Sequence, residues 1–275
     1  MAALGLCSTA TAGGPRAVRW VAVPPFVKRR PPAAPGSIPA VLGMFTGEVR
    51  FYREIAPLLG VRVPACYTAE DTAEGTLLVL EDLSAWTPGA DPARAARVLS
   101  GMHHRWSGAG PVRWPWLRPI GAAIDLVEEL YARTWPHLVQ RGDLPRPVAA
   151  FSEALVGRVT DAERAILDAG PLTIIHGDAQ ARNMRTGPAG EVALLDWEDV
   201  SAAPGLLDLA WLLTSSTDPG RWDEVIDAYG PAHGLHHVLP AVIVQGLLSM
   251  TGEPPGSPEA RAWTARLDEA CSRLR

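Results

Sequence analysis

Hydrophobic and polar positions follow strand-like patterns near the start of the chain. Residues 16–23 alternate and include β-branched and aromatic side chains, which predicts a strand, and residues 26–28 form the apolar centre of a second strand. Four prolines within residues 31–39 predict a loop after it. The first part of the chain is therefore expected to contain β-structure.

From residue 46 to residue 59 the pattern changes to a helical period. Apolar side chains recur here at spacings of three or four residues, and Thr46 is a candidate cap for the helix. Two β-rich runs follow at residues 61–67 and 76–80, and the polar residues 70–75 predict the turn between them. These elements predict a β-rich N-terminal part with one long helix.

Beyond residue 83 the periodicity is mainly helical. The predicted helices span residues 91–103, 120–139 and 147–169. We therefore divide the chain into a β-rich part, residues 1–83, and a helical part, residues 84–275, which together predict an α+β fold.

The composition restricts the classes to which the chain can belong. Charged residues make up 20% of its 275 residues and hydrophobic residues 47%, which indicates a globular protein. A net charge of −5 argues against a nucleic-acid partner. The three cysteines are too far apart for a disulfide framework, and neither a signal peptide nor a run of 18 apolar residues occurs. We therefore expect a cytoplasmic protein with no membrane partner.

A single lysine, Lys28, stands among 24 arginines. A coding bias this strong toward arginine suggests that the lysine is retained for a reason. A compact ammonium group fits sites that a planar guanidinium does not. The alternative is a solvated strand residue without a special role.

The segment from Leu172 to Glu198 carries the clearest chemical signal. An apolar strand leads into a loop that holds His176, Asp178 and, five positions after the aspartate, Asn183. A short strand, a turn of glycine and proline, and a second apolar strand then end at Asp196. The hairpin is expected to bring Asp178, Asn183 and Asp196 to one end of the sheet.

Residues of these types suit phosphoryl transfer, which depends mainly on positioning and charge stabilisation. A carboxylate can hold an acceptor hydroxyl and take its proton, while an amide oxygen and a second carboxylate can bind Mg²⁺ on nucleotide phosphates. The catalytic loop of protein kinases has the same order: an Asp, an Asn five residues later, and a metal-binding Asp after a hairpin. The alternative is a structural turn at His176 and a strand cap at Asp196.

The pattern HGDxxxxN followed by DWE, with Gly205 and Asp208 downstream, resembles the aminoglycoside phosphotransferase and choline-kinase-like family. The upstream signals occur in the order typical of that family, here Lys28, Glu48-Val-Arg-Phe-Tyr52, Val63-Pro64 and Leu78-Val-Leu-Glu-Asp-Leu83. The resemblance extends from about residue 8 to about residue 230. It implies a bilobal protein-kinase-like fold with a small β-rich N-lobe and a larger, mainly helical C-lobe.

The resemblance also implies roles for the residues of the motif. Asp178 would be the catalytic base, and His176 would orient the loop that carries it. Asn183 and Asp196 would be the Mg²⁺ ligands. Asp208 would be a structural anchor beneath the loop.

By the same resemblance, the N-terminal part would bind the nucleotide, ATP or another nucleoside triphosphate. Lys28 would contact the α and β phosphates, held in place by Glu48 from the helix. A hinge would meet the adenine base through its backbone, and its residues are Leu80, Glu81 and Leu83.

Several of these assignments have competitors. Glu54 lies nearly two helical turns after Glu48, and the sequence does not decide which of the two pairs with the lysine. A histidine cluster invites a zinc hypothesis but lacks partners at useful spacing, so we interpret it as a loop; it consists of His233, His236 and His237. Three tryptophans are candidates for a substrate pocket or, alternatively, for helix packing: Trp106, Trp114 and Trp116.

Only 27 residues precede Lys28, fewer than the resemblance leads us to expect. We therefore expect either a truncated N-lobe or a start codon assigned too late. Residues 8–14, which are small or polar, are the candidate phosphate-covering loop.

The acceptor is expected to be a small molecule. Only eleven residues separate Asp196 from Asp208, too few for the long segment with which protein kinases dock a peptide. Glu198 and Asp199 are the candidate acceptor-binding residues and, with the negative net charge, favour a cationic acceptor. Alternatively, Glu198 is a ligand of a second metal ion or a solvated residue without a role in the site.

The sequence thus predicts an ATP- and Mg²⁺-dependent O-phosphotransferase, a monomer or homodimer. Its acceptor would be a hydroxyl group of an antibiotic, of the aminoglycoside or peptide type, or of a natural-product intermediate. The alternatives are a non-catalytic nucleotide-binding pseudokinase, a choline, amino-alcohol or sugar kinase, and a protein kinase.

Overall fold

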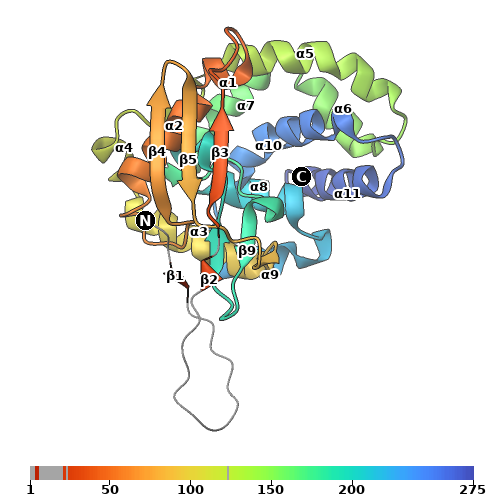
Figure 1. Cartoon of the computed structure of the whole chain (residues 1–275). Helices are drawn as coiled ribbons and strands as arrows, with labels where there is room; N and C mark the ends of the chain where they lie inside the picture. Colours follow the sequence, from red (N-terminus) through yellow and green to blue (C-terminus); the bar gives the residue numbers. More distant parts are fainter. Residues whose placement is uncertain (1–3, 6–20, 23, 123) are drawn as a thin grey trace.

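The structure of the protein, a computed structural model, describes residues 4–5, 21–22, 24–122 and 124–275. A small β-rich lobe stands beside a larger helical lobe, which confirms the predicted α+β bilobal fold (Figure 1). The division at residue 83 stays a prediction. The predicted phosphate-covering loop lies outside the described residues. So does most of the predicted strand 16–23, of which Val21–Ala22 (β2) pairs with Leu4–Gly5 (β1).

Three antiparallel strands form the sheet of the small lobe, in the order β3–β5–β4. They are Phe26–Arg30 (β3), Gly75–Leu80 (β5) and Cys66–Thr72 (β4). The strand predicted at 61–67 is wrong over most of its length, because Pro64 has no amide to donate to a ladder. The turn predicted at 70–75 is shorter in the structure, at residues 73–74, because β4 extends to Thr72, which pairs with Gly75.

The predicted helix of the small lobe consists of two parts. Met44–Arg50 (α2) continues directly into a π-helix, Phe51–Ile55. Its cap is Gly43 and not Thr46, because the cap residue has a φ of 59°, which glycine adopts without a steric penalty. A four-residue helix, Ile38–Val41 (α1), precedes it and begins within the predicted proline-rich loop of residues 31–39.

The helices of the large lobe pack around a buried pair, α8 and α10. Their bounds are Pro92–Trp106 (α3), Gly110–Arg113 (α4), Ile124–Gln140 (α5), Arg146–Ala154 (α6), Val159–Ala165 (α7), Leu206–Ser216 (α8), Trp222–Tyr229 (α9), Leu235–Ser249 (α10) and Pro258–Ser272 (α11). The single helix predicted at 147–169 is wrong. Gly157, with a φ of +75°, ends its first part, and a 3₁₀ helix, Ile166–Ala169, ends its last.

Two small sheets in the large lobe hold the loops that carry the motif. In one, β8 (Leu172–Ile175) pairs antiparallel with β11 (Ser201–Pro204), which pairs with β7 (Arg118–Pro119). In the other, β9 (Met184–Thr186) pairs with β10 (Val192–Leu194), as the predicted hairpin requires, and with β6 (Thr87–Pro88). The loops after β8, before β9 and after β10 consequently meet at one place.

An aromatic stack joins the small lobe to these loops. The rings of Phe51 and Trp197 lie 4.1 Å apart at an interplanar angle of 10°, and both residues are fully buried. Phe51 belongs to the helical segment after α2, whereas Trp197 lies in the DWE motif. The stack therefore fixes the helix that carries Glu48 against the loop that carries Asp196.

One segment, Leu235–Gly252, is long and apolar enough to cross a membrane by length and composition alone. It comprises α10 and the short 3₁₀ helix after it, and 56% of it is buried inside the protein. Helices α5, α7, α8 and α11 pack against it, as is usual for the core helix of a helical lobe.

A buried carboxyl on α7 generates a prediction about pH. Glu163 is 4% exposed, and burial raises its pKa from the ordinary 4.5 to about 7. Between these two values the folded protein keeps a proton that the unfolded chain releases, so this group lowers stability as the pH rises. Above pH 7 the full penalty applies, because the folded state then buries an ionised carboxylate.

We therefore expect Glu163→Gln to stabilise the protein at pH 8 by about 2 kcal/mol, and to have much less effect at pH 5. Urea unfolding of both proteins at the two pH values measures this difference. Glu153→Gln, on the exposed side of α6, is the matched control. An equal effect of Glu163→Gln at both pH values would show that the charge of this carboxyl is not responsible.

Candidate active site

The loop that begins at His176 is held from beneath by one carboxylate. Asp208, near the start of α8, accepts the backbone amide of His176 at 2.7 Å and that of Gly177 at 2.9 Å. The ring of His103 on α3 lies 3.1 Å from the same carboxylate. Asp208 thus occupies the position of an anchor for this loop.

Asp208 is almost completely buried, and burial alone would raise its pKa. Hydrogen bonds and charge interactions with His103 and His176 outweigh burial and hold the pKa of Asp208 below its ordinary value. His103 is itself oriented by the hydroxyl of Tyr229, 2.9 Å away. The sequence analysis missed His103, although a histidine on the buried face of α3 was a usable signal.

His176 orients the middle of the loop. Its Nε2 lies 2.8 Å from the carbonyl oxygen of Leu195, and its Nδ1 accepts the amide of Asp178 at 3.2 Å. This pair of contacts requires the tautomer that carries its proton on Nε2. The ring is fully buried and lies 4.5 Å from that of Trp197. His176 therefore connects the loop to the strand that ends at Asp196.

Asp178 points its carboxylate toward the helical side of the loop. It accepts hydrogen bonds from the indole of Trp211 on α8 at 2.6 Å and from the amide of Asn183 at 2.8 Å. The side chain of Gln180 also donates to it. Trp211 was not predicted, because nothing in its sequence position distinguishes it from the apolar residues of α8.

Asn183 and Asp196 meet on the other side of the loop. The hairpin brings them together, since the amide of Leu195 donates to the carbonyl of Asn183 at 2.8 Å. The amide group of Asn183 donates to Asp178, which leaves its oxygen directed away from Asp178. Asp196 has a φ of 61°, the single positive φ among the non-glycine residues that the structure describes. Two hard oxygen donors thus line one cavity.

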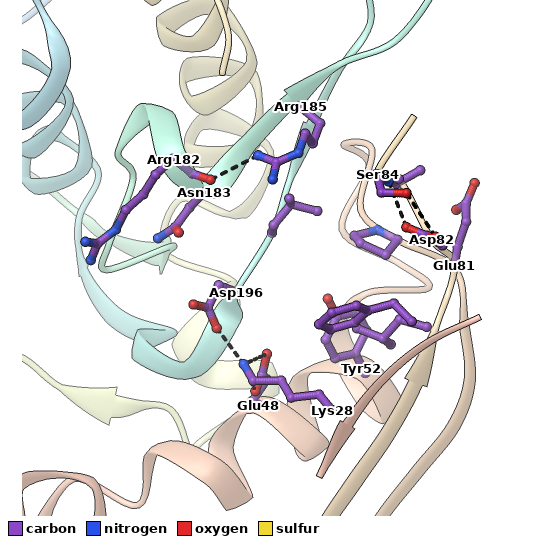
Figure 2. A pocket seen from close by; sticks show the side chains of 15 residues that line it. Lys28, Glu48, Tyr52, Glu81, Asp82, Ser84, Arg182, Asn183, Arg185 and Asp196 are labelled. Atoms are coloured by element: carbon purple, nitrogen blue, oxygen red, sulfur yellow. Dashed lines mark hydrogen bonds and ion pairs between the residues drawn. The ribbon is translucent and has the colours of Figure 1, made fainter. Parts of the chain in front are cut away.

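Lys28 lies between two carboxylates, as Figure 2 shows. Its Nζ is 2.7 Å from Glu48 and 2.6 Å from Asp196. Burial opposes its charge, but these two carboxylates outweigh burial and raise the pKa of Lys28 above its ordinary value. Glu54, the competing glutamate, instead contacts Arg50 at 3.0 Å and the indole of Trp116.

The two predicted acceptor residues lie apart. Glu198 lies 3.6 Å from Lys28 and 2.5 Å from Arg30, on the side of the sheet. Asp199 faces the helices, where Arg118 lies 3.5 Å from it. Burial raises the pKa of Asp199, and the charge of Arg118 opposes this shift. The position of Glu198 therefore does not support its assignment to an acceptor.

A cavity of about 360 Å³ lies between the sheet, the hinge and the loop (Figure 2), and we call it the hinge cavity. Lys28, Glu48, Asn183 and Asp196 line one part of it, and residues 80–84 line another. Its remaining walls are largely apolar and include Phe26, Pro64 and Leu195. The predicted phosphate-contacting and base-contacting residues therefore share one cavity.

Residues 80–84 of the hinge line this cavity. The amide of Glu81 donates to the carbonyl of Ala65 at 2.8 Å, and its carboxylate is held by Arg62 at 2.6 Å. For the amide of Leu83, no acceptor occurs within the described ranges. The hydroxyl of Tyr52, also in this cavity, is buried and has no partner among the described residues. Such groups suit a ligand that both donates and accepts hydrogen bonds.

A second cavity of about 590 Å³ opens on the helical side of the loop, and we call it the helix cavity. Asp178, Asp199 and Glu253 contribute carboxylates to it, and Trp211 and Trp263 contribute indole rings 5.9 Å apart. Gly177 is required at its edge, because a Cβ there would overlap the carbonyl oxygen of Asp199.

The remaining sequence candidates lie elsewhere. The histidine cluster is not a loop as predicted, since His236 and His237 belong to the first turn of α10. Within the described ranges, a carboxylate group at Glu48, Asp196 and Glu198 is the one set with metal-ligand spacing. The three candidate tryptophans pack against each other or bind Glu54, in line with the packing alternative, and none of them lines the helix cavity.

A family model described as "Phosphotransferase enzyme family" matches residues 16–241. The chain belongs to this family. It is thus a phosphotransferase of the small-molecule class, with an alcohol group as acceptor. No curated protein sequence matches the chain.

Solved structures of distant relatives share the fold of this phosphotransferase. A spectinomycin phosphotransferase solved with ADP and spectinomycin has 14% identity and a TM-score of 0.53, over 90% of this chain and 84% of its own. An aminoglycoside phosphotransferase from Streptomyces rimosus has 18% identity and a TM-score of 0.58, over 82% and 86%. A choline kinase from Streptococcus pneumoniae has 18% identity and a TM-score of 0.52, over 82% and 80%. All three support the protein-kinase-like fold.

The contacts of Lys28 generate a prediction about the phosphotransferase. The longer, planar guanidinium cannot place a single nitrogen where the ammonium lies between Glu48 and Asp196, so Lys28→Arg should displace one of these carboxylates. We expect the apparent Kd for MgATP to rise at least tenfold, or about 1.4 kcal/mol. A thermal-shift titration with MgATP measures this affinity.

Arg29→Lys serves as the control, because Arg29 is exposed on the same strand and lines neither cavity. It should leave the affinity for MgATP unchanged. Normal MgATP affinity in the Lys28→Arg protein would mean that the single lysine is an accident of composition.

Proposed function

We propose that the chain transfers the γ-phosphoryl group of ATP, or of another nucleoside triphosphate, to a hydroxyl group of a small molecule held in the helix cavity. One observation carries this proposal. The Asp178 carboxylate faces the helix cavity, while Lys28, Asn183 and Asp196 face the hinge cavity, so one loop separates an acceptor site from a nucleotide site.

The residues that line the hinge cavity suit a nucleotide. The backbone amide of Leu83 and the hydroxyl of Tyr52, which have no partner among the described residues, offer hydrogen bonds for a base between apolar walls. Lys28 supplies a positive charge for phosphates. Distant relatives were solved with ADP and with GDP, so the base itself stays to be determined.

The donor set on the loop also fits Mg²⁺. The side-chain oxygen of Asn183 and the carboxylate of Asp196 are hard ligands in residues that both line the hinge cavity. A bound Mg²⁺ would neutralise charge on the phosphates during transfer. Lys28 holds the carboxylate of Asp196 in place meanwhile, and Glu48 holds Lys28.

Asp178 is proposed as the base. Its carboxylate would accept the proton of the acceptor hydroxyl as the oxygen attacks phosphorus. Trp211 and Asn183 direct the carboxylate by hydrogen bonds, while Asp208 fixes the start of the loop. These contacts hold the base in one orientation before the acceptor binds, which is how positioning lowers a barrier.

The helix cavity suits an acceptor with a positive charge and an apolar or aromatic part. Asp199 and Glu253 offer carboxylates, and the Trp211–Trp263 pair offers ring faces on which a cation or a sugar ring can lie. We propose an antibiotic of the aminoglycoside or peptide type or a natural-product intermediate, with a choline-like alcohol as the alternative. We propose a cytoplasmic location, since Cys66 and Cys271 are unpaired.

Asp178→Asn tests the proposal. The amide keeps the size of the carboxylate but cannot accept the proton, so we expect turnover to fall by about 10²-fold or more. Nucleotide binding should be largely retained, because Asp178 does not line the hinge cavity. ATP consumption against a panel of amino sugars, peptide antibiotics and choline-like alcohols measures turnover, and thermal shift with MgATP measures binding.

Asp168→Asn, an exposed aspartate outside both cavities, is the control and should behave like the wild type. If the wild type binds MgATP tightly but phosphorylates no acceptor of the panel, the result supports the non-catalytic alternative. If Asp178→Asn turns over at the wild-type rate, Asp178 is not the base.

A further inference from the structure

Arg182 occupies a position that no other described residue shares. Among the residues that the structure describes, it is the one that lines both the hinge cavity and the helix cavity. A phosphoryl group that moves from the nucleotide to the acceptor crosses from one cavity to the other. Arg182 therefore lies at the boundary that the group must pass, provided that the proposed function holds.

The backbone of Arg182 is fixed while its side chain is free. It lies in a 3₁₀ helix, Ala181–Asn183, whose first amide donates to the hydroxyl of Ser216 on α8 at 2.8 Å. Its carbonyl accepts a hydrogen bond from Arg185 at 3.2 Å. The side chain, in contrast, is 74% exposed. In Figure 2 its guanidinium points away from the hinge residues, toward the far side of the loop.

The free guanidinium lies near the proposed base. It is 3.6 Å from the carboxylate of Asp178, a contact that is loose compared with the hydrogen bonds of Trp211 and Asn183 to the same group. Those two hydrogen bonds hold Asp178 without Arg182. The guanidinium can therefore leave the carboxylate for a stronger anion without disturbing the base.

The other arginines near this boundary have their donors engaged. The side chain of Arg118 bonds the carbonyl of Leu42 at 3.0 Å and the hydroxyl of Ser201 at 3.1 Å. That of Arg185 bonds the carbonyls of Arg182 and Met184. Arg182, 74% exposed, is the arginine lining these two cavities whose guanidinium has no hydrogen bond to another described residue.

We propose that Arg182 is a further catalytic residue, whose guanidinium binds the equatorial oxygens of the phosphoryl group during transfer. In this step the bond from the γ-phosphorus to the bridging oxygen breaks, and its electron pair leaves with ADP. The acceptor oxygen bonds the phosphorus, and its proton passes to Asp178. Arg182 forms and breaks no covalent bond.

A guanidinium suits this task because negative charge spreads over three equatorial oxygens as the group is transferred. Its planar fork binds two such oxygens through a pair of parallel hydrogen bonds, a geometry that an ammonium does not offer. The single lysine of the chain, Lys28, is already held by Glu48 and Asp196. Arg182 thus supplies, from the same chain, a positive charge on the acceptor side of the phosphoryl group.

The test compares the ground state with a mimic of the transition state. MgADP and MgADP with aluminium fluoride are titrated against the wild type, Arg182→Ala and Arg182→Lys. The wild type should bind the fluoride complex about 10²-fold or more tightly than MgADP alone. In Arg182→Ala this preference should fall by about 10²-fold, whereas MgADP affinity stays near the wild-type value. Arg182→Lys should lie between the two.

A kinetic comparison gives the second readout. With an acceptor that is turned over, Arg182→Ala should lower kcat by about 10²-fold and leave the KM for ATP nearly unchanged. Arg97→Ala removes the same charge from the exposed face of α3, outside both cavities, and should resemble the wild type in both assays.

The outcomes separate this proposal from the proposed function. A wild type that prefers the fluoride complex, with the preference kept by Arg182→Ala, overturns the role of Arg182 and leaves phosphoryl transfer intact. Equal losses for MgADP and for the fluoride complex also overturn it, since they indicate a merely structural residue. A wild type with no preference and no turnover contradicts phosphoryl transfer itself and this role with it.

Discussion

The buried carboxylate of Asp208 is the interaction on which the arrangement of the candidate site depends. It is 1% exposed, and it is stabilised as an anion by the ring of His103 and by the backbone amides of His176 and Gly177. A charge buried this deeply must keep its partners, because losing one leaves an uncompensated ion in a low-dielectric interior. The direction in which the chain leaves β8 is therefore set by α8 and α3 and not by the loop alone.

From that fixed start, the loop forms the wall between two cavities. Its first half presents Asp178 to the helices, and its second half presents Asn183 to the sheet and the hinge. The hairpin returns the chain so that Asp196 lies beside Asn183, and Lys28 reaches Asp196 from the small lobe. The division of labour proposed for phosphoryl transfer thus follows from local chain geometry: one side of the loop for the nucleotide, the other for the acceptor.

Features encoded by local spacing could be predicted from the sequence, whereas contacts between distant segments of the chain could not. The loop and hairpin were predictable, because an Asp, an Asn five residues later and an Asp at a strand end are local features. Glu48 and Glu54 were not distinguishable, since a helix pattern does not state which turn faces Lys28. His103 was missed because its partner is more than a hundred residues away in the chain. Helix ends were mispredicted where a positive φ at glycine, as at Gly43, overrides the preference of a nearby threonine.

In the proposed function, a phosphoryl group passes across this loop from a nucleotide to an alcohol. Phosphorus-31 NMR of the protein with MgATP and each amino sugar, peptide antibiotic or choline-like alcohol of the panel tests this transfer. We expect the γ-phosphate signal of ATP to decline while a phosphate monoester signal of the acceptor rises in equal amount. A γ-phosphate that is lost only as inorganic phosphate, with every acceptor unchanged, would contradict it.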